Sequence, residues 1–304
     1  MAKSNAPRAS VDIYQEITNQ VIESLESVNV DDFSAPFARL AGQGTPRNPI
    51  TGRAYQGINT LLLWFAQTQY GFTSNEWATF KQWQTKGAKV KKGEKATLII
   101  FYKPVPKVNE EGEDDFYHMI KSYWVFNADQ VEGYDTPYTL DEGAFGTVEK
   151  IERIDTFIKG SAAIVIEDQP CPCFIPSRDE IHMNPKDVYF EGLGQSATEN
   201  YYAVLLHELT HWSGGEKRLN REFTGNQKLK AYAFEELIAE LGSAFLCAQF
   251  DIKQQGRNDH IQYIKSWLVG LRNDKKYIFK ASAQAQKAVE FLNQLNTPDN
   301  AEAA

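Results

Sequence analysis

The 304-residue sequence lacks the features of a membrane-spanning or disulfide-bonded protein. No apolar run approaches the roughly 18 residues that a transmembrane helix needs, and the first residues, MAKSNAPRAS, include no apolar signal segment. Its three cysteines are too few for a disulfide framework, and Cys171 and Cys173 are spaced too tightly for an easy bridge. We therefore expect a cytoplasmic protein in a reducing compartment, without a membrane partner.

The length of the chain favours two domains, because single hydrophobic cores rarely grow beyond roughly 250 residues. Acidic residues and glycines cluster without hydrophobic periodicity between residues 128 and 147. Such a stretch is typical of a connection between domains. The sequence thus predicts a first domain over residues 1–130, a linker over residues 131–147 and a second domain over residues 148–304.

The net charge of -8 is distributed unevenly along the chain. From Arg39 to Lys103 there are ten lysines and arginines against two acids, Glu76 and Glu94, so this segment is strongly basic. Aromatic residues alternate with these cations, a combination that suits a protein binding single-stranded nucleic acid. An acidic mimic of DNA would need a continuous negative surface, and the basic segment argues against that class.

Two kinds of DNA contact are predicted within the basic segment. Stacking on bases is assigned to exposed aromatic side chains, and we expect Trp64, Phe65 and Phe101 to belong to the core instead. The predicted stacking residues are Tyr55, Trp77 and Trp83. The predicted phosphate contacts, chosen because no nearby acid except Glu94 neutralises them, are Arg47, Arg53, Lys81, Lys89, Lys91, Lys92 and Lys95.

Hydrophobic periodicity predicts an α+β fold class. Helical spacing marks several segments, and two runs rich in β-branched and aromatic residues flank an acidic loop as in a hairpin. In the first half we expect helices at residues 11–28 and 58–68 and strands at 96–102 and 117–126. In the second half we expect strands at 161–166 and 180–183, followed by helices near 197–213, 231–250, 258–272 and 279–295.

The segment HELTH, residues 207–211, has the HExxH pattern of a metal site. Positions i and i+4 share one face of a helix, so His207 and His211 can reach the same metal ion. Neutral imidazole is a good zinc ligand, and Glu208 is placed to take a proton from metal-bound water attacking a carbonyl. The pattern predicts a zinc-dependent peptidase with Glu208 as general base, although Mn²⁺ or Co²⁺ suits the same ligands.

A third ligand is expected from the apolar helix about 25 residues further on. Glu236 and Glu240 share a face of this helix, whereas Glu235 is turned about 100° away. We assign Glu236 as the third ligand and Glu240 as the carboxylate that orients a histidine, with the exchange of these two roles left open. The small residues Gly242 and Ser243 should let this helix approach the HExxH helix closely.

Other groups of the predicted catalytic site are less well defined. His260 and Tyr263 share a helix face and are candidates for stabilising the oxyanion. The strand at residues 180–183 could bind an extended peptide along its edge. Cys171 and Cys173 lie far from HExxH in sequence and lack a usual zinc spacing, so we do not assign them as ligands.

Motifs in both halves resemble those of the ArdC-type antirestriction proteins. The first half contains PRNPITGRAYQGIN (residues 46–59), TFKQ (79–82) and VKKGEK (90–95). The second half contains LHELTHWSG (206–214), YAFEELIAEL (232–241) and the segment 260–267. The two sets of motifs point to the same family over nearly the whole chain.

The resemblance implies a mixed α/β domain that binds single-stranded DNA, followed by a zincin-like metallopeptidase domain. It also implies a plasmid-encoded protein that protects incoming conjugative DNA from host restriction, with a restriction-system component as a potential protein substrate. One alternative is a non-catalytic protein that coats single-stranded DNA and whose metal site is structural or inert.

Overall fold

The computed structural model describes residues 12–26, 44–108, 114–135, 148–189, 196–221, 228–252 and 261–297. Its first half contains α1 (Ile13–Glu26), α3 (Ile58–Tyr70), β1 (Trp77–Thr79), α4 (Phe80–Thr85), β2 (Lys89–Val90), β3 (Thr97–Val108), β4 (Asp114–Asn127), η1 (Ala128–Gln130) and β5 (Val131–Glu132). Its second half contains α5 (Val148–Gly160), β6 (Ile164–Ile166), β7 (Cys173–Ile175), β8 (Glu180–His182), η2 (Lys186–Val188), α6 (Ala197–Ser213), α7 (Lys228–Gln249), α8 (Ile261–Asn273) and α9 (Tyr277–Leu295). The α+β fold class is confirmed.

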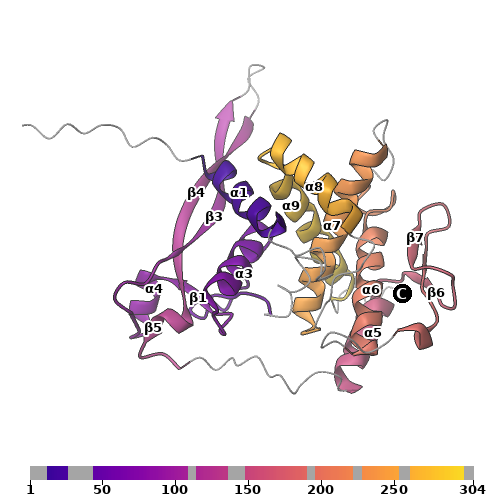
Figure 1. Cartoon of the computed structure of the whole chain (residues 1–304), viewed down its shortest axis with the longest axis horizontal. Helices are drawn as coiled ribbons and strands as arrows, with labels where there is room; N and C mark the ends of the chain where they lie inside the picture. Colours follow the sequence, from indigo (N-terminus) through magenta and orange to yellow (C-terminus); the bar gives the residue numbers. More distant parts are fainter. Residues whose placement is uncertain are drawn as a thin grey trace, which may run out of the picture.

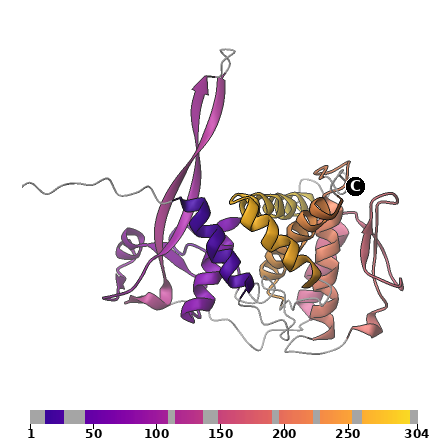
Figure 2. The same cartoon turned by 45° about the horizontal axis from the view of Figure 1, so that its top comes forward.

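A long antiparallel hairpin dominates the first half. Strands β3 and β4 pair from Thr97 opposite Val125 to Val108 opposite Asp114, and β1 adds to the other side of β4. The far end of this hairpin stands away from the body of the molecule (Figure 2). The predicted hairpin is confirmed and is longer than expected, while residues 109–113 at its tip lie outside the described residues.

Helix α3 covers the outer edge of β3. The side chain of Asn59, at the start of α3, accepts a hydrogen bond from the backbone N–H of Ile100 at 2.9 Å. Its amide group donates to the Ile100 carbonyl at 2.7 Å. This pair satisfies backbone groups that an edge strand would otherwise present to solvent or to another chain.

The second half places a helical bundle beside a small sheet (Figure 1). The sheet has the order β6-β8-β7, so β8 is its central strand. The expectation that residues 180–183 provide a free strand edge is therefore wrong, because both edges of β8 are paired. Helix α5 was not predicted either, although Ile154, Phe157 and Ile158 bury one of its faces.

One hydrophobic cluster runs through both halves of the chain. It joins Ile17 of α1 and Leu62 of α3 to Leu206 of α6, Leu237 of α7 and Ile278 of α9. The halves are thus packed together as well as linked in sequence. The predicted domain boundary stays a prediction, since residues 136–147 lie outside the described residues. None of the helices within the described ranges is long and apolar enough to cross a membrane.

Helices α6 and α7 pack closely at a glycine. Ser196 and Glu199 form a capping box that fixes the start of α6. Further along, a Cβ atom placed on Gly242 of α7 would lie 2.5 Å from the Thr210 Cγ2 of α6. Thr210 is held in place by the hydrogen bond that its hydroxyl donates to the Leu206 carbonyl. The predicted close approach of these two helices is confirmed.

We predict that Gly242→Ala destabilises the protein by about 1–3 kcal/mol, the usual cost of overpacking a core. The clash outweighs the higher helix propensity of alanine. Urea unfolding of the wild type and the variant measures the difference. The same substitution in a Thr210→Ser background should cost less, because the clashing methyl group is gone. An unchanged midpoint for Gly242→Ala would contradict close packing at this position.

Candidate metal centre

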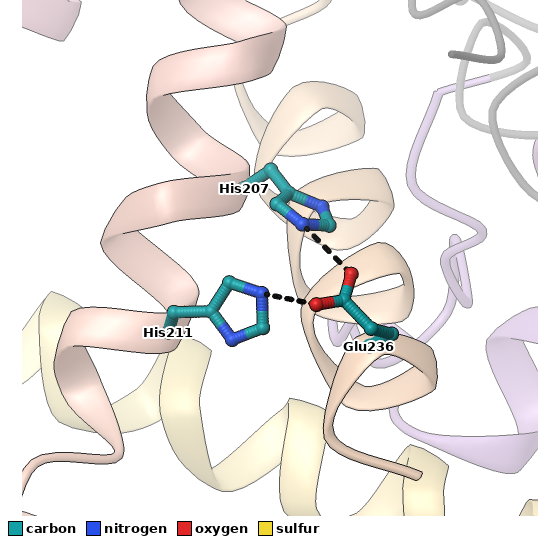
Figure 3. Close-up of side chains that lie close together, drawn as sticks. All are labelled: His207, His211 and Glu236. Atoms are coloured by element: carbon teal, nitrogen blue, oxygen red, sulfur yellow. Dashed lines mark ion pairs between the residues drawn. The ribbon is translucent and has the colours of Figure 1, made fainter. Parts of the chain in front are cut away.

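Three buried side chains from α6 and α7 converge on one point. His207 and His211 lie one turn apart on α6, and Glu236 faces them from α7 (Figure 3). The Nε2 atom of His207 lies 3.6 Å from Glu236 Oε2, and the Nε2 atom of His211 lies 3.5 Å from Glu236 Oε1. Both imidazoles thus direct the same nitrogen toward one carboxylate.

The spacing of these groups fits a metal ion. One ligand atom of each of the three residues lies within 4.8 Å of the other two. Ligand atoms about 2.1 Å from a tetrahedral zinc lie about 3.4 Å from one another, close to the separations of 3.5 and 3.6 Å between the imidazoles and the carboxylate. Two imidazoles and one carboxylate are also a common donor set for catalytic zinc.

Two further carboxylates face the other nitrogens of the histidines. Glu240 Oε2 lies 3.8 Å from the Nδ1 atom of His207, and Glu235 Oε1 lies 3.1 Å from the Nδ1 atom of His211. The Glu235 contact is a hydrogen bond of the kind that orients a metal-binding imidazole and fixes its tautomer, whereas Glu240 lies at ion-pair distance from His207. Glu240 thus faces a histidine, and its role in orienting that histidine stays a prediction, whereas the contact of Glu235 was not predicted.

Arg221 joins Glu235 to the end of α6. Its guanidinium donates to Glu235 at 2.8 Å, to the Thr210 carbonyl at 2.6 Å and to the Ser213 hydroxyl at 3.0 Å. Buried charges of this kind are tolerated when they are paired and hydrogen-bonded. Arg221 therefore neutralises Glu235 and locks the contact between Glu235 and His211.

The carboxylates change the protonation of the site. Burial opposes the charged imidazolium of His211, yet Glu235 and Glu236 outweigh it and raise the pKa of His211 to about 10. Burial likewise disfavours the charged form of Glu236, but the two histidines hold the pKa of Glu236 well below its usual range. Both shifts favour a protonated His211 beside ionised carboxylates. A metal ion would bind in competition with the His211 proton.

Strands β7 and β8 lie beside α6, the helix that carries HExxH. Helix α6 contacts both β7 and β8, and Glu208 is buried on this helix. Burial, the neighbouring Cys171 and the charge of Glu208 together raise the pKa of the Cys173 thiol to about 11. In this sheet β7, unlike β8, is an edge strand, and it contacts α6.

The remaining residues predicted for catalysis are only partly covered by the structure. His260 lies outside the described residues, and for Tyr263 the backbone within α8 is described but not the side chain. Their proposed role in stabilising an oxyanion stays a prediction. Among the described residues, the group that could hold a metal ion consists of His207, His211 and Glu236.

The exposure expected for the stacking aromatics is wrong. Trp77 and Trp83 are fully buried, and Tyr55 is 9% exposed. The indole of Trp83 donates to the Phe126 carbonyl within a cluster that includes Val131, and the Tyr55 hydroxyl donates to the Trp77 carbonyl. These rings stabilise the first half from inside and offer no face to a base.

Most of the residues predicted to contact phosphates have exposed side chains, as expected. Arg47 differs, since its guanidinium lies 2.9 Å from the buried carboxylate of Glu76, which partly neutralises it. Lys91 is exposed and donates to the Asp129 carbonyl at 2.8 Å. Phe101, expected in the core, is 48% exposed. The side chains exposed as expected are those of Arg53, Lys81, Lys89, Lys91, Lys92 and Lys95.

Both halves of the chain match known protein families. The family model described as the N-terminal domain of anti-restriction factor ArdC matches residues 11–126, and the model described as zincin-like metallopeptidase matches residues 152–284. The metal-free crystal structure of the antirestriction ArdC protein from the R388 plasmid is 35% identical, with a TM-score of 0.77, and the match covers 93% of this chain and 97% of that one. The chain belongs to the ArdC antirestriction family.

Further similarities each extend over more than nine-tenths of this chain. The Mn(II)-bound structure of the R388 protein has a TM-score of 0.75 at 33% identity, and the match covers 94% of this chain and 99% of that one. The uncharacterized protein y4eC of Sinorhizobium fredii (strain NBRC 101917 / NGR234) is 32% identical over 302 residues, 96% of this chain and 95% of y4eC. DNA primase TraC of Escherichia coli is 30% identical over 303 residues, which are 92% of this chain but 27% of TraC.

We predict that Glu235→Gln weakens metal binding about 10- to 100-fold, the usual effect of altering a group that orients a metal-binding histidine. Glutamine keeps the size of the side chain but removes the charge that faces His211 and Arg221. Chelator competition with Zn²⁺ measures the affinity. Glu216→Gln, an exposed substitution after α6, is the matched control and should bind as the wild type does. Equal affinities for the two variants would contradict the role of Glu235.

Proposed function

We propose that this ArdC-family chain is a metal-dependent peptidase that also binds single-stranded DNA and protects incoming conjugative plasmid DNA from restriction. The observation that carries the peptidase part is the buried group of His207, His211 and Glu236, with Glu208 on the same helix. A restriction-system component is the proposed protein substrate.

Zn²⁺ is the proposed metal, with Mn²⁺ and Co²⁺ as alternatives. The donor set suits all three ions, and the R388 relative has a Mn(II)-bound structure. A metal ion held by these residues would supply a Lewis acid and would make bound water more acidic. Glu208 is the proposed group that takes the proton of the attacking water. Glu235 and Glu240, which face the Nδ1 atoms of the two imidazoles, are the proposed groups that orient the Nε2 atoms toward the centre.

Binding of single-stranded DNA is proposed for the first half. Exposed cations provide sites for phosphates, and the match to a DNA primase is consistent with a role on DNA. Because phosphate contacts release counterions, the affinity should fall as the salt concentration rises. Non-specific binding by backbone contacts would show little preference for sequence.

Glu208→Ala should abolish peptide cleavage while leaving the metal bound, because the metal-binding side chains are intact. Elemental analysis and cleavage of a fluorescent peptide library measure the two properties. Loss of the metal would contradict the assignment of Glu208 as a base outside the ligand set. Protection from restriction, measured by conjugation into restricting cells, separates the two activities. If protection from restriction survives the substitution, the protection comes from the coating of DNA and does not require peptide cleavage.

Replacing Lys89, Lys92 and Lys95 together by glutamine should weaken binding to single-stranded DNA and make it less dependent on salt. Each lost phosphate contact lowers the slope of log affinity against log salt by about 0.7, so the slope should fall by about 2. Fluorescence anisotropy over a salt series measures it. The control replaces three exposed lysines of the second half, Lys159, Lys217 and Lys265. An equal slope in both triple variants would contradict the proposed contacts.

A further inference from the structure

A groove of about 800 Å³ lies between the β1-β4-β3 sheet and α9. Phe101 and Tyr123 of the sheet line it on one side, and Phe279 and Gln286 of α9 line it on the other. The loop around Arg53 supplies a further part of its lining. The groove is therefore built from both halves of the chain, and it is separate from the His207 site.

The sheet presents an exposed pair of aromatic rings to this groove. Ile99 pairs with Tyr123 and Phe101 pairs with Lys121, so these four side chains share one face of the sheet. The rings of Phe101 and Tyr123 meet edge to face, with centroids 5.3 Å apart, and are 48% and 39% exposed. The two ring planes are almost perpendicular, at 87°, so each ring offers an accessible face of its own, and together they form an aromatic platform on which nucleic-acid bases can stack.

The charge of the groove suits a nucleic acid. None of its lining residues in the described part of the chain is acidic, and Arg53 is the cation among them. Lys121, opposite Phe101 on the same sheet face, is exposed as well. The aromatic platform is thus flanked by positive charges that can hold phosphates.

The loop that carries Arg53 is held in place before any ligand binds. The Asn48 side chain accepts hydrogen bonds from the backbone N–H groups of Ile50 and Thr51, and Gly52 takes a left-handed φ of 69°. The Asn48 N–H in turn donates to the Arg53 carbonyl at 2.8 Å. This local network fixes the backbone of Arg53 at the rim, so little ordering of the loop would be required on binding.

We propose that this groove binds single-stranded DNA, with bases stacked on the exposed faces of the Phe101 and Tyr123 rings and phosphates held by Arg53 and Lys121. The proposal rests on the proposed DNA binding and names the surface that carries it. A single strand is required because the paired bases of a duplex do not offer their faces for stacking. The buried Trp77 and Trp83 cannot provide this contact, whereas the exposed sheet face can.

The second wall of the groove belongs to the second half of the chain. That wall is α9, which packs against α7, the helix that carries Glu235 and Glu236. A strand in the groove would therefore contact the metallopeptidase half directly. A residue of α9, far in sequence from every basic residue of the first half, should then influence DNA binding.

The first test measures anisotropy of a labelled thymidine oligonucleotide with the full-length protein. Phe101→Ala and Tyr123→Ala should each raise the Kd about 5- to 150-fold, the effect expected for loss of one stacked base. Tyr123→Phe keeps the ring and should bind as the wild type does. Trp124→Ala is the matched control, because Trp124 is 56% exposed and adjacent to Tyr123 but points to the opposite face of the sheet.

The second test uses Ala283, an exposed residue of α9 that lines the groove. Ala283→Glu adds a negative charge beside the proposed path of the phosphates and should weaken binding at low salt. Ala283→Gln adds a side chain of similar size without the charge and should have the smaller effect. Thermal unfolding and metal content, unchanged in all variants, would exclude misfolding as the cause.

The outcomes separate this inference from the broader proposal. If the wild type fails to bind the oligonucleotide even at low salt, both the DNA-binding function and the groove are wrong. If the wild type binds, and Phe101→Ala, Tyr123→Ala and Ala283→Glu bind equally well, the groove alone is wrong. A loss confined to Trp124→Ala would also overturn it and would place the DNA on the opposite sheet face.

Discussion

The close packing of α6 against α7 is the constraint on which the candidate site depends. The absence of a side chain at Gly242 lets α7 approach Thr210, and this approach brings the Glu236 carboxylate to the two imidazoles. Burying several carboxylates in one helix would be strongly unfavourable without partners. The histidines and Arg221 supply these partners, so packing and electrostatics stabilise the same arrangement.

The continuity of the hydrophobic core extends this arrangement to the rest of the chain. Helix α9 packs against α7 and also lines the groove that contains Phe101. The proposed DNA surface and the proposed metal centre therefore share a framework of packed helices. Such a framework allows a single strand bound in the groove to be positioned relative to the metallopeptidase domain.

The sequence predicted what depends on local periodicity and left unresolved what depends on packing. The spacing of His207 and His211 specifies a shared helix face, and the hairpin follows from its β-branched runs. The contact of Glu235 depends on how α7 lies against α6, which no local pattern contains. The alternation of side chains along a strand likewise shows that Phe101 and its neighbours in sequence face opposite sides of a sheet. It does not show which of these sides is covered by other parts of the protein. Trp83 was misassigned for the same reason, because distant Val131 helps to bury it.

The most direct test of the central claim is the metal content of three purified proteins, measured by elemental analysis. The account predicts about one metal ion per wild-type chain, in line with a single site of three protein ligands. The metal should be lost in Glu236→Gln and retained in Glu240→Gln, since Glu240 faces the Nδ1 atom of His207. A wild type that stays metal-free after zinc is added, or a loss in Glu240→Gln alone, would contradict the account.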